Sequence, residues 1–115
     1  MLFSYGDGEY FEGNQHFRGK ILLSDHKLFL KGPQGDITAT YMPLEKIERM
    51  RQGFRGVEIF VRPSQFLSYR VLLRGKRKYL AELIRDLVKR RRFVRRWFRN
   101  EWVDREVIQE RTFDV

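Results

Sequence analysis

The residues with the clearest chemical potential form a run of cations near the C-terminal end of the chain. Between residues 89 and 99, seven of eleven side chains are Lys or Arg. A guanidinium group forms planar, two-pronged hydrogen bonds with phosphate or carboxylate, so this run favours an anionic partner. With the neighbouring aromatic residues, the candidate partner-binding residues are Lys89, Arg90, Arg91, Arg92, Arg95, Arg96, Trp97, Phe98, Arg99 and Trp102.

The aromatic residues within and after this run have three interpretations. Trp97, Phe98 and Trp102 are of the types that dominate protein interfaces, and Trp also lies at the head-group level of bilayers. They could instead pack against their own chain. The first interpretation predicts docking of a protein or self-association through this end of the chain, the second a membrane surface, and the third a structural role.

The charge of the chain is unevenly placed. The 115 residues carry a formal charge of +9, yet residues 70–99 hold thirteen cations against only Glu82 and Asp86. Residues 100–115 form an acidic tail with Glu101, Asp104, Glu106, Glu110 and Asp114. Such a local excess indicates an electrostatic role toward a partner, or toward the tail itself, which could mask the basic run.

Composition and spacing argue against an enzyme or a metal site. The chain has no Cys, which excludes disulfides and thiolate zinc sites. Ser24, Asp25 and His26 are adjacent, and neighbours in a hairpin cannot arrange a base and its orienting group around one nucleophile. His16 and His26 lack further ligands at suitable spacing. We expect no cofactor, no metal and no small-molecule substrate.

The chain up to residue 75 has the pattern of a β domain. Short runs of β-forming residues alternate with Gly, Pro, Asp and Ser punctuation, and this predicts seven short strands. Val57, Ile59 and Val61 alternate with polar or exposed positions, as in a half-buried strand. Residues 32–35 predict a β-turn and residues 36–42 the strand after it.

After Gly75 the period changes to that of a helix. Leu80, Leu83, Ile84 and Leu87 share one face at helical spacing. No Gly or Pro interrupts the run that follows, so we expect one long amphipathic helix over residues 76–99, roughly 36 Å long. Its basic and aromatic end would project beyond the β domain.

Two motifs resemble a known family. Residues 17–30 look like the GRAM-type signature, in which a Gly opens a strand and a Leu with an aromatic residue begins the next. Residues 42–47 resemble its Ile-Pro-Leu-x-x-Ile element, with Met42 in place of Ile. The stretch 20–47 is also similar to the PH-like part of the archaeal chemotaxis adaptor CheF. The resemblance implies a pleckstrin-homology-like (PH-like) α+β fold, in which a seven-stranded antiparallel β-barrel or sandwich is closed by one long C-terminal helix.

The resemblance also implies a non-enzymatic adaptor or scaffold whose relatives bind lipid head groups or proteins. We therefore expect a PH/GRAM-like domain over residues 1–90, a basic-aromatic helical extension over 91–99 and an acidic tail over 100–115. The basic helix would bind a protein partner or an anionic membrane surface. The alternative is a nucleic-acid-binding protein. No apolar stretch is long enough to span a membrane, so we expect a cytoplasmic protein, with peripheral attachment to a membrane as the alternative.

Overall fold

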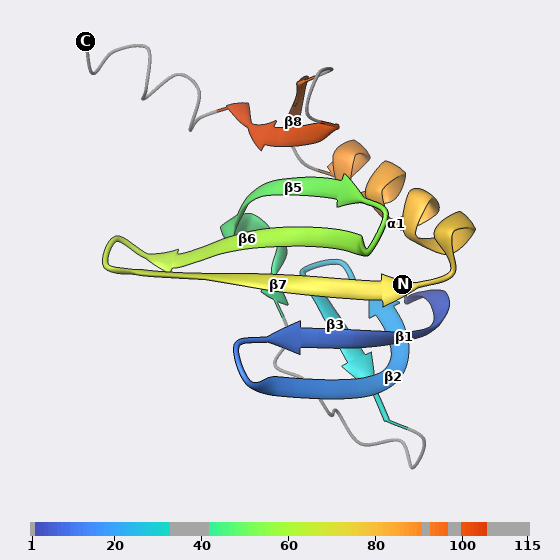
Figure 1. The fold of residues 1–115 in the computed structure, drawn as a ribbon. Coiled ribbons are helices and arrows are strands. Elements are labelled where there is room, and N and C mark those ends of the chain that lie inside the picture. Colours follow the sequence, from blue (N-terminus) through green and yellow to red (C-terminus); the bar gives the residue numbers. More distant parts are fainter. Residues whose placement is uncertain (1, 33–41, 91–92, 97–99, 106–115) are drawn as a thin grey trace, which may run out of the picture.

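A computed structural model describes residues 2–32, 42–90, 93–96 and 100–105 (Figure 1). These residues form one α-helix and nine strands. The strands are β1 (Phe3–Glu12), β2 (Gln15–Leu23), β3 (Lys27–Lys31), β4 (Met42–Pro43), β5 (Ile47–Gly53), β6 (Gly56–Ser64), β7 (Leu67–Gly75), β8 (Phe93–Arg96) and β9 (Glu101–Asp104). The helix α1 spans Arg77–Arg90, and a 3-10 turn, η1 (Leu44–Lys46), precedes β5.

All nine strands belong to one antiparallel sheet in the order β4-β3-β2-β1-β7-β6-β5-β9-β8. The sheet is open, so the expected seven-stranded barrel closed by a long C-terminal helix is wrong. At one end, β4 contributes only two residues to its pairing with β3. At the other end, the β8–β9 hairpin pairs with the edge of β5. That edge is therefore occupied by two further strands instead of closing a barrel.

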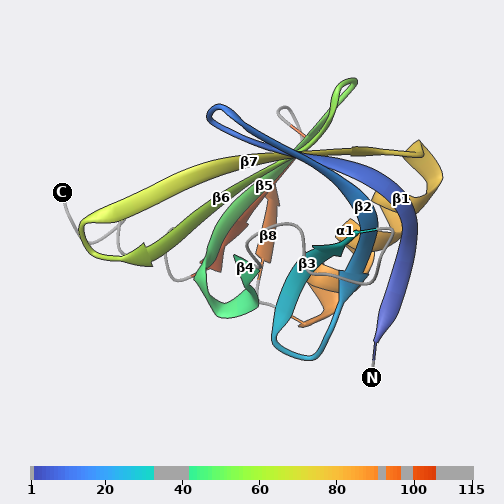
Figure 2. The same cartoon turned by 90° about the horizontal axis from the view of Figure 1, so that it is seen from below.

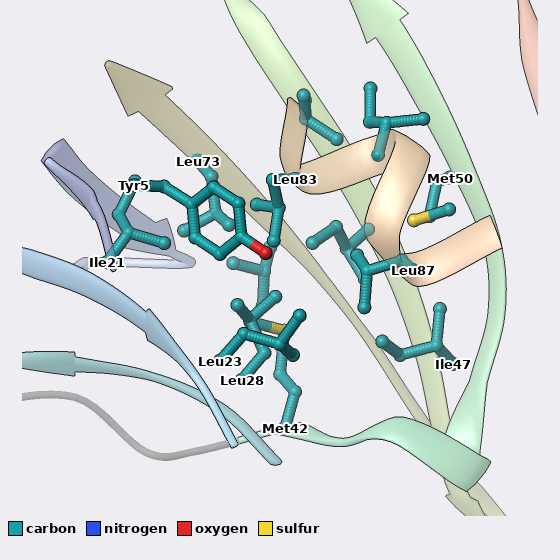
Figure 3. Packing of buried hydrophobic residues seen from close by; sticks show 14 of the residues in the cluster. Tyr5, Ile21, Leu23, Leu28, Met42, Ile47, Met50, Leu73, Leu83 and Leu87 are labelled. Carbon is teal, nitrogen blue, oxygen red and sulfur yellow. The ribbon is translucent and has the colours of Figure 1, made fainter. Parts of the chain in front are cut away.

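The core lies between the bent sheet and α1. Figure 2 shows the strands curving around the helix. Leu80, Leu83, Ile84 and Leu87 are buried, which confirms the face predicted from their spacing. In Figure 3, Leu83 and Leu87 point toward apolar side chains of the surrounding strands. Val57, Ile59 and Val61 of β6 are likewise buried, as their alternation predicted.

Glycines allow the sheet to bend beside the helix. Gly8 of β1 lies in register with Gly19 of β2 and Gly75 of β7, which forms a glycine row across three strands. A Cβ on Gly8 would come within 2.4 Å of the Ile21 side chain, and a Cβ on Gly19 within 2.4 Å of the Lys31 carbonyl oxygen. The strands can approach this closely because these positions have no side chain.

The helix expected over residues 76–99 is wrong in its second half. α1 ends at Arg90, and Phe93–Arg96 is strand β8. A continued helix would stack Arg91 on Arg95 and Arg92 on Arg96, four residues apart, where like charges repel. Phe93 and Val94 favour a strand instead. Part of the predicted acidic tail is also a strand, since Glu101–Asp104 is β9.

The remaining expectations have mixed outcomes. Ser24, Asp25 and His26 form the β2–β3 turn as predicted, and Lys27–Lys31 is a strand. Most of the β-turn at 32–35 and of the strand at 36–42 lies outside the described residues. Within the part of the chain that the structure describes, no helix combines the length and apolarity that crossing a membrane requires.

Candidate functional site

The ten candidate partner-binding residues divide into two groups. Lys89 and Arg90 lie in the last turn of α1, Arg95 and Arg96 in β8, and Trp102 in β9. The other candidates, Arg91, Arg92, Trp97, Phe98 and Arg99, lie outside the described residues. The structure therefore replaces the projecting helix by a helix end followed by the β8–β9 hairpin, which adds to the β5 edge of the sheet (Figure 1).

Arg90 has a structural role at the end of α1. Its Nη1 donates to the carbonyl oxygen of Ser24 in the β2–β3 turn, and its guanidinium carbon lies 5.3 Å from the centre of the Phe3 ring. A cation at this end also interacts favourably with the helix dipole. Arg90 thus joins the helix end to the opposite half of the sheet, whereas Lys89 beside it is exposed.

The β8–β9 hairpin is attached to β5 through its turn residue. Asn100 has a φ of 50°, a left-handed conformation that Asn adopts more readily than most residues. Its side-chain amide donates to the backbone carbonyl oxygen of Gln52 at 3.2 Å, and the backbone amide of Gln52 donates to the backbone carbonyl oxygen of Asn100 at 3.1 Å. These reciprocal hydrogen bonds set the register of β9 on β5.

Trp102 faces the helix side of the sheet. It lies in register with Met50 of β5, is half-buried and packs against the core. Arg95, its partner on β8, places its guanidinium carbon 5.4 Å from the centre of the indole ring. Trp102 therefore anchors the hairpin and holds Arg95 by a cation–π contact.

Glu101 is the one buried charged side chain among the described residues, at 4% exposure. Its Oε1 lies 3.6 Å from Nη1 of Arg49 on β5, and the Arg49 guanidinium lies 4.0 Å from the centre of the Phe60 ring. The sequence prediction placed Glu101 in an acidic tail that neutralises the Arg run. The structure instead pairs it with a cation fifty-two residues earlier in the chain.

A row of alternating charge crosses this end of the sheet. Arg96 of β8 lies in register with Glu101, Glu101 with Arg51 of β5, and Arg51 with Glu58 of β6. Opposite charges on neighbouring strands stabilise such pairs. Arg96 is half-buried in this row, whereas Arg95 and Val94 are exposed.

The histidines lie in ordinary surface contacts. His16 is 3.1 Å from a Glu9 carboxylate oxygen and stacks on Phe11 at 4.3 Å. His26 lies in the β2–β3 turn, where its amide donates to Ser24 Oγ. Across the described ranges, no group of three or more His, Cys, Asp or Glu side chains could hold a metal ion.

Comparison of the chain with protein-family models, curated proteins and solved structures gives no match. The GRAM-type and CheF resemblances therefore stay predictions. Chemically, the hairpin and helix end offer exposed cations beside one exposed aliphatic side chain on a firmly attached strand pair. That arrangement can bind carboxylate or phosphate groups.

Proposed function

We propose that the protein is a non-enzymatic adaptor module that binds an acidic protein partner through its basic C-terminal segment, residues 89–105. One observation carries this proposal. In the β8–β9 hairpin the uncharged and acidic residues, Asn100, Glu101 and Trp102, attach the strands to the domain. Lys89 and Arg95 are exposed, and Arg95 also contacts the Trp102 ring.

A protein partner fits this surface better than a bilayer does. Val94 is exposed at 40%, but Trp102, the aromatic candidate within the described part of the hairpin, is half-buried against the core. The described hairpin thus offers little apolar surface for insertion between lipids. A protein partner can place acidic side chains against the cations of the hairpin and bury Val94 within the same contact. We place the module in the cytoplasm, where peripheral attachment to a membrane would follow from its partner.

The test is capture of partners from native lysate, followed by titration of the purified partner. The variant carries Arg91→Gln, Arg92→Gln, Arg95→Gln and Arg96→Gln. The control removes four exposed cations elsewhere, through Lys46→Gln, Arg77→Gln, Lys78→Gln and Arg85→Gln. The proposal expects a protein that survives nuclease treatment, binds the control and is lost with the variant. Equal loss in both chains would contradict it.

A second candidate, nucleic-acid binding, is favoured by the face of the sheet away from α1. There Arg49 lies over Phe60, and Arg70 is in register with Phe60 on the next strand. Cations combined with aromatic rings on a sheet face can bind single-stranded nucleic acid. This candidate expects nuclease-sensitive capture and an affinity that falls linearly with the logarithm of salt concentration, with a slope of about −0.7 per neutralised phosphate.

A further inference from the structure

A large hollow with a volume of about 1280 Å³ lies beside the sheet. It is lined mainly by residues of β1, the second half of β2, the end of β3, the end of β7 and the β5–β6 turn. Three glycines at its wall, Gly8, Gly19 and Gly75, belong to the glycine row.

The charge of the hollow is predominantly positive. Its cationic lining residues are Arg18, Lys20, Lys31, Arg55 and Arg74. Two carboxylates, Asp7 and Glu9, also line it. Glu9 lies 3.1 Å from His16 and 3.9 Å from Arg18 and is the register partner of Arg74 on β7, so it offsets part of the positive charge, and the cations still outnumber the carboxylates.

Two of these cations lie directly opposite one another. Lys20 of β2 and Lys31 of β3 are register partners, and both are exposed. Like charges at this position on neighbouring strands destabilise a sheet. Asp7 of β1, the other register partner of Lys20, offsets part of this repulsion, and a multiply charged anion bound between the two lysines would remove the rest. Arg18, two residues from Lys20 along β2, extends the positive surface on the same face.

The rim of the hollow adds an aromatic ring. Phe54 in the β5–β6 turn is 90% exposed, and the Arg55 guanidinium lies 5.7 Å from its ring centre. An exposed Phe can stack on a nucleobase, and Arg can reach phosphate from the same turn. Cations in the hollow and a flat ring at its rim match the phosphates and the base of a nucleotide.

We propose that this hollow binds a nucleoside di- or triphosphate. Lys20, Lys31, Arg18 and Arg74 contact the phosphates, and Phe54 stacks on the base. The site shares no residue with the basic C-terminal segment. It therefore goes beyond the proposed adaptor function, and either can fail without the other.

The test is calorimetric titration of the whole chain with ATP at low salt. The variant is Lys20→Gln with Lys31→Gln, and the control is Lys46→Gln with Lys78→Gln, which removes the same charge from exposed positions outside the hollow. Loss of two charge-assisted contacts should weaken ATP binding about tenfold or more in the variant, with little change in the control. Equal weakening in both chains, or no ATP binding by the wild type, would overturn the proposal.

Further probes distinguish binding of the base from binding of the phosphates, and binding of a free nucleotide from binding of lipid or nucleic-acid phosphates. Phe54→Ala should weaken ATP binding without affecting inorganic tripolyphosphate, and equal affinity of wild type for the two probes would overturn the stacking role. Binding only to vesicles of anionic phospholipid, or only to a single-stranded oligonucleotide, would also overturn the proposal. ATP binding that survives the four-Arg substitution of the C-terminal segment would support a separate site. The double variant removes the Lys20–Lys31 repulsion together with the Lys20–Asp7 attraction, so it should fold about as stably as wild type, which circular dichroism can check.

Discussion

The two ends of the sheet are held by different forces. Around α1, strands β1 to β7 contribute apolar side chains that are completely or almost completely buried, such as Ile21 and Leu73, and α1 itself contributes Leu83. The β8–β9 hairpin has fewer such side chains, namely buried Val103 and the half-buried Phe93 and Trp102. It is also held by an Arg49–Glu101 ion pair and by reciprocal Asn100–Gln52 hydrogen bonds.

This difference separates stability from binding in the molecule. Burial of apolar surface is the dominant favourable term in folding, so the core half carries most of the folding free energy. The hairpin adds polar contacts, which give register and direction with a smaller net contribution each. We therefore expect substitutions in the core to unfold the protein, and substitutions in the hairpin to loosen β8 and β9 while the core persists.

The largest expected effect comes from the core. Leu83 is completely buried on α1, so Leu83→Ala should lower the free energy of unfolding by about 2–5 kcal/mol. Leu67→Ala, at a position 65% exposed near the tip of the β6–β7 hairpin, is the control and should change it by less than about 0.5 kcal/mol. Urea denaturation measures both. Similar losses at the two sites would remove the distinction between core and periphery.

The next largest loss of stability is expected from a substitution at a glycine. Gly56 has a φ of 142°, and a Cβ there would lie 2.1 Å from the Leu73 carbonyl oxygen. Gly56→Ala must shift β6 against β7 and should cost about 2–3 kcal/mol. At Gly53, in the same hairpin, a Cβ meets nothing within 4 Å, so Gly53→Ala should be close to neutral in the same urea experiment. A neutral Gly56→Ala would show that the two strands do not approach this closely.

In the hairpin, Glu101→Gln removes one partner of the buried ion pair. Arg49 keeps partial access to water, so the expected cost is about 1–2 kcal/mol, between the values for exposed and buried pairs. The matched control is Glu48→Gln, whose partner Arg62 is 53% exposed and lies 3.5 Å away. Hydrogen exchange should speed up at β9 and leave α1 protected. Faster exchange throughout α1 would mean that the hairpin and core unfold as one unit.

Substitution of Tyr5 should change the stability of the fold by a smaller amount at neutral pH and by a larger amount in alkali. Burial, and then the 2.6 Å hydrogen bond that its hydroxyl donates to Asp86, raise the pKa of Tyr5 well above its ordinary value of 10.0. Since the folded state holds this proton more tightly, the resulting stability is complete below about pH 10 and is lost as pH rises toward the folded-state pKa.

Tyr5→Phe should therefore cost about 1 kcal/mol at pH 7, through loss of the hydrogen bond. It should also reduce the loss of stability above pH 10, by up to about 1.4 kcal/mol per pH unit. Thermal unfolding across pH 7–11.5 measures both effects. A variant that loses stability in alkali as steeply as the wild type would exclude Tyr5 as a source of that loss.

Much of the core half could be predicted from the sequence. The alternation of Val57, Ile59 and Val61 and the helical spacing of Leu80, Leu83, Ile84 and Leu87 each describe one buried face. These patterns are local, so each element carries its own signal. Whether the sheet closes into a barrel cannot be predicted from such local patterns, because it depends on which strands pair at the edges.

The hairpin was mispredicted because its signals compete. Arg, Lys and Trp are all compatible with a helix, and the register of β9 on β5 depends on contacts across about fifty residues. Phe93 with Val94, Trp102 with Val103, and an Asn at position 100 between them were the available signs of two strands and a turn. For the candidate site, packing of Trp102 on its own chain was one of the three alternatives, whereas the link from Arg90 to the β2–β3 turn had no sign in the sequence. Binding of a partner by the cations stays a prediction.

The most direct test of the account is to determine the backbone conformation of residues 90–105 in solution by nuclear magnetic resonance. The account predicts a helix that ends at Arg90, strand-like Cα shifts over Phe93–Arg96 and Glu101–Asp104, and proton–proton contacts between Met50 and Trp102. Helical shifts continuing from Arg90 through Arg99, with no contact between β5 and residue 102, would contradict it.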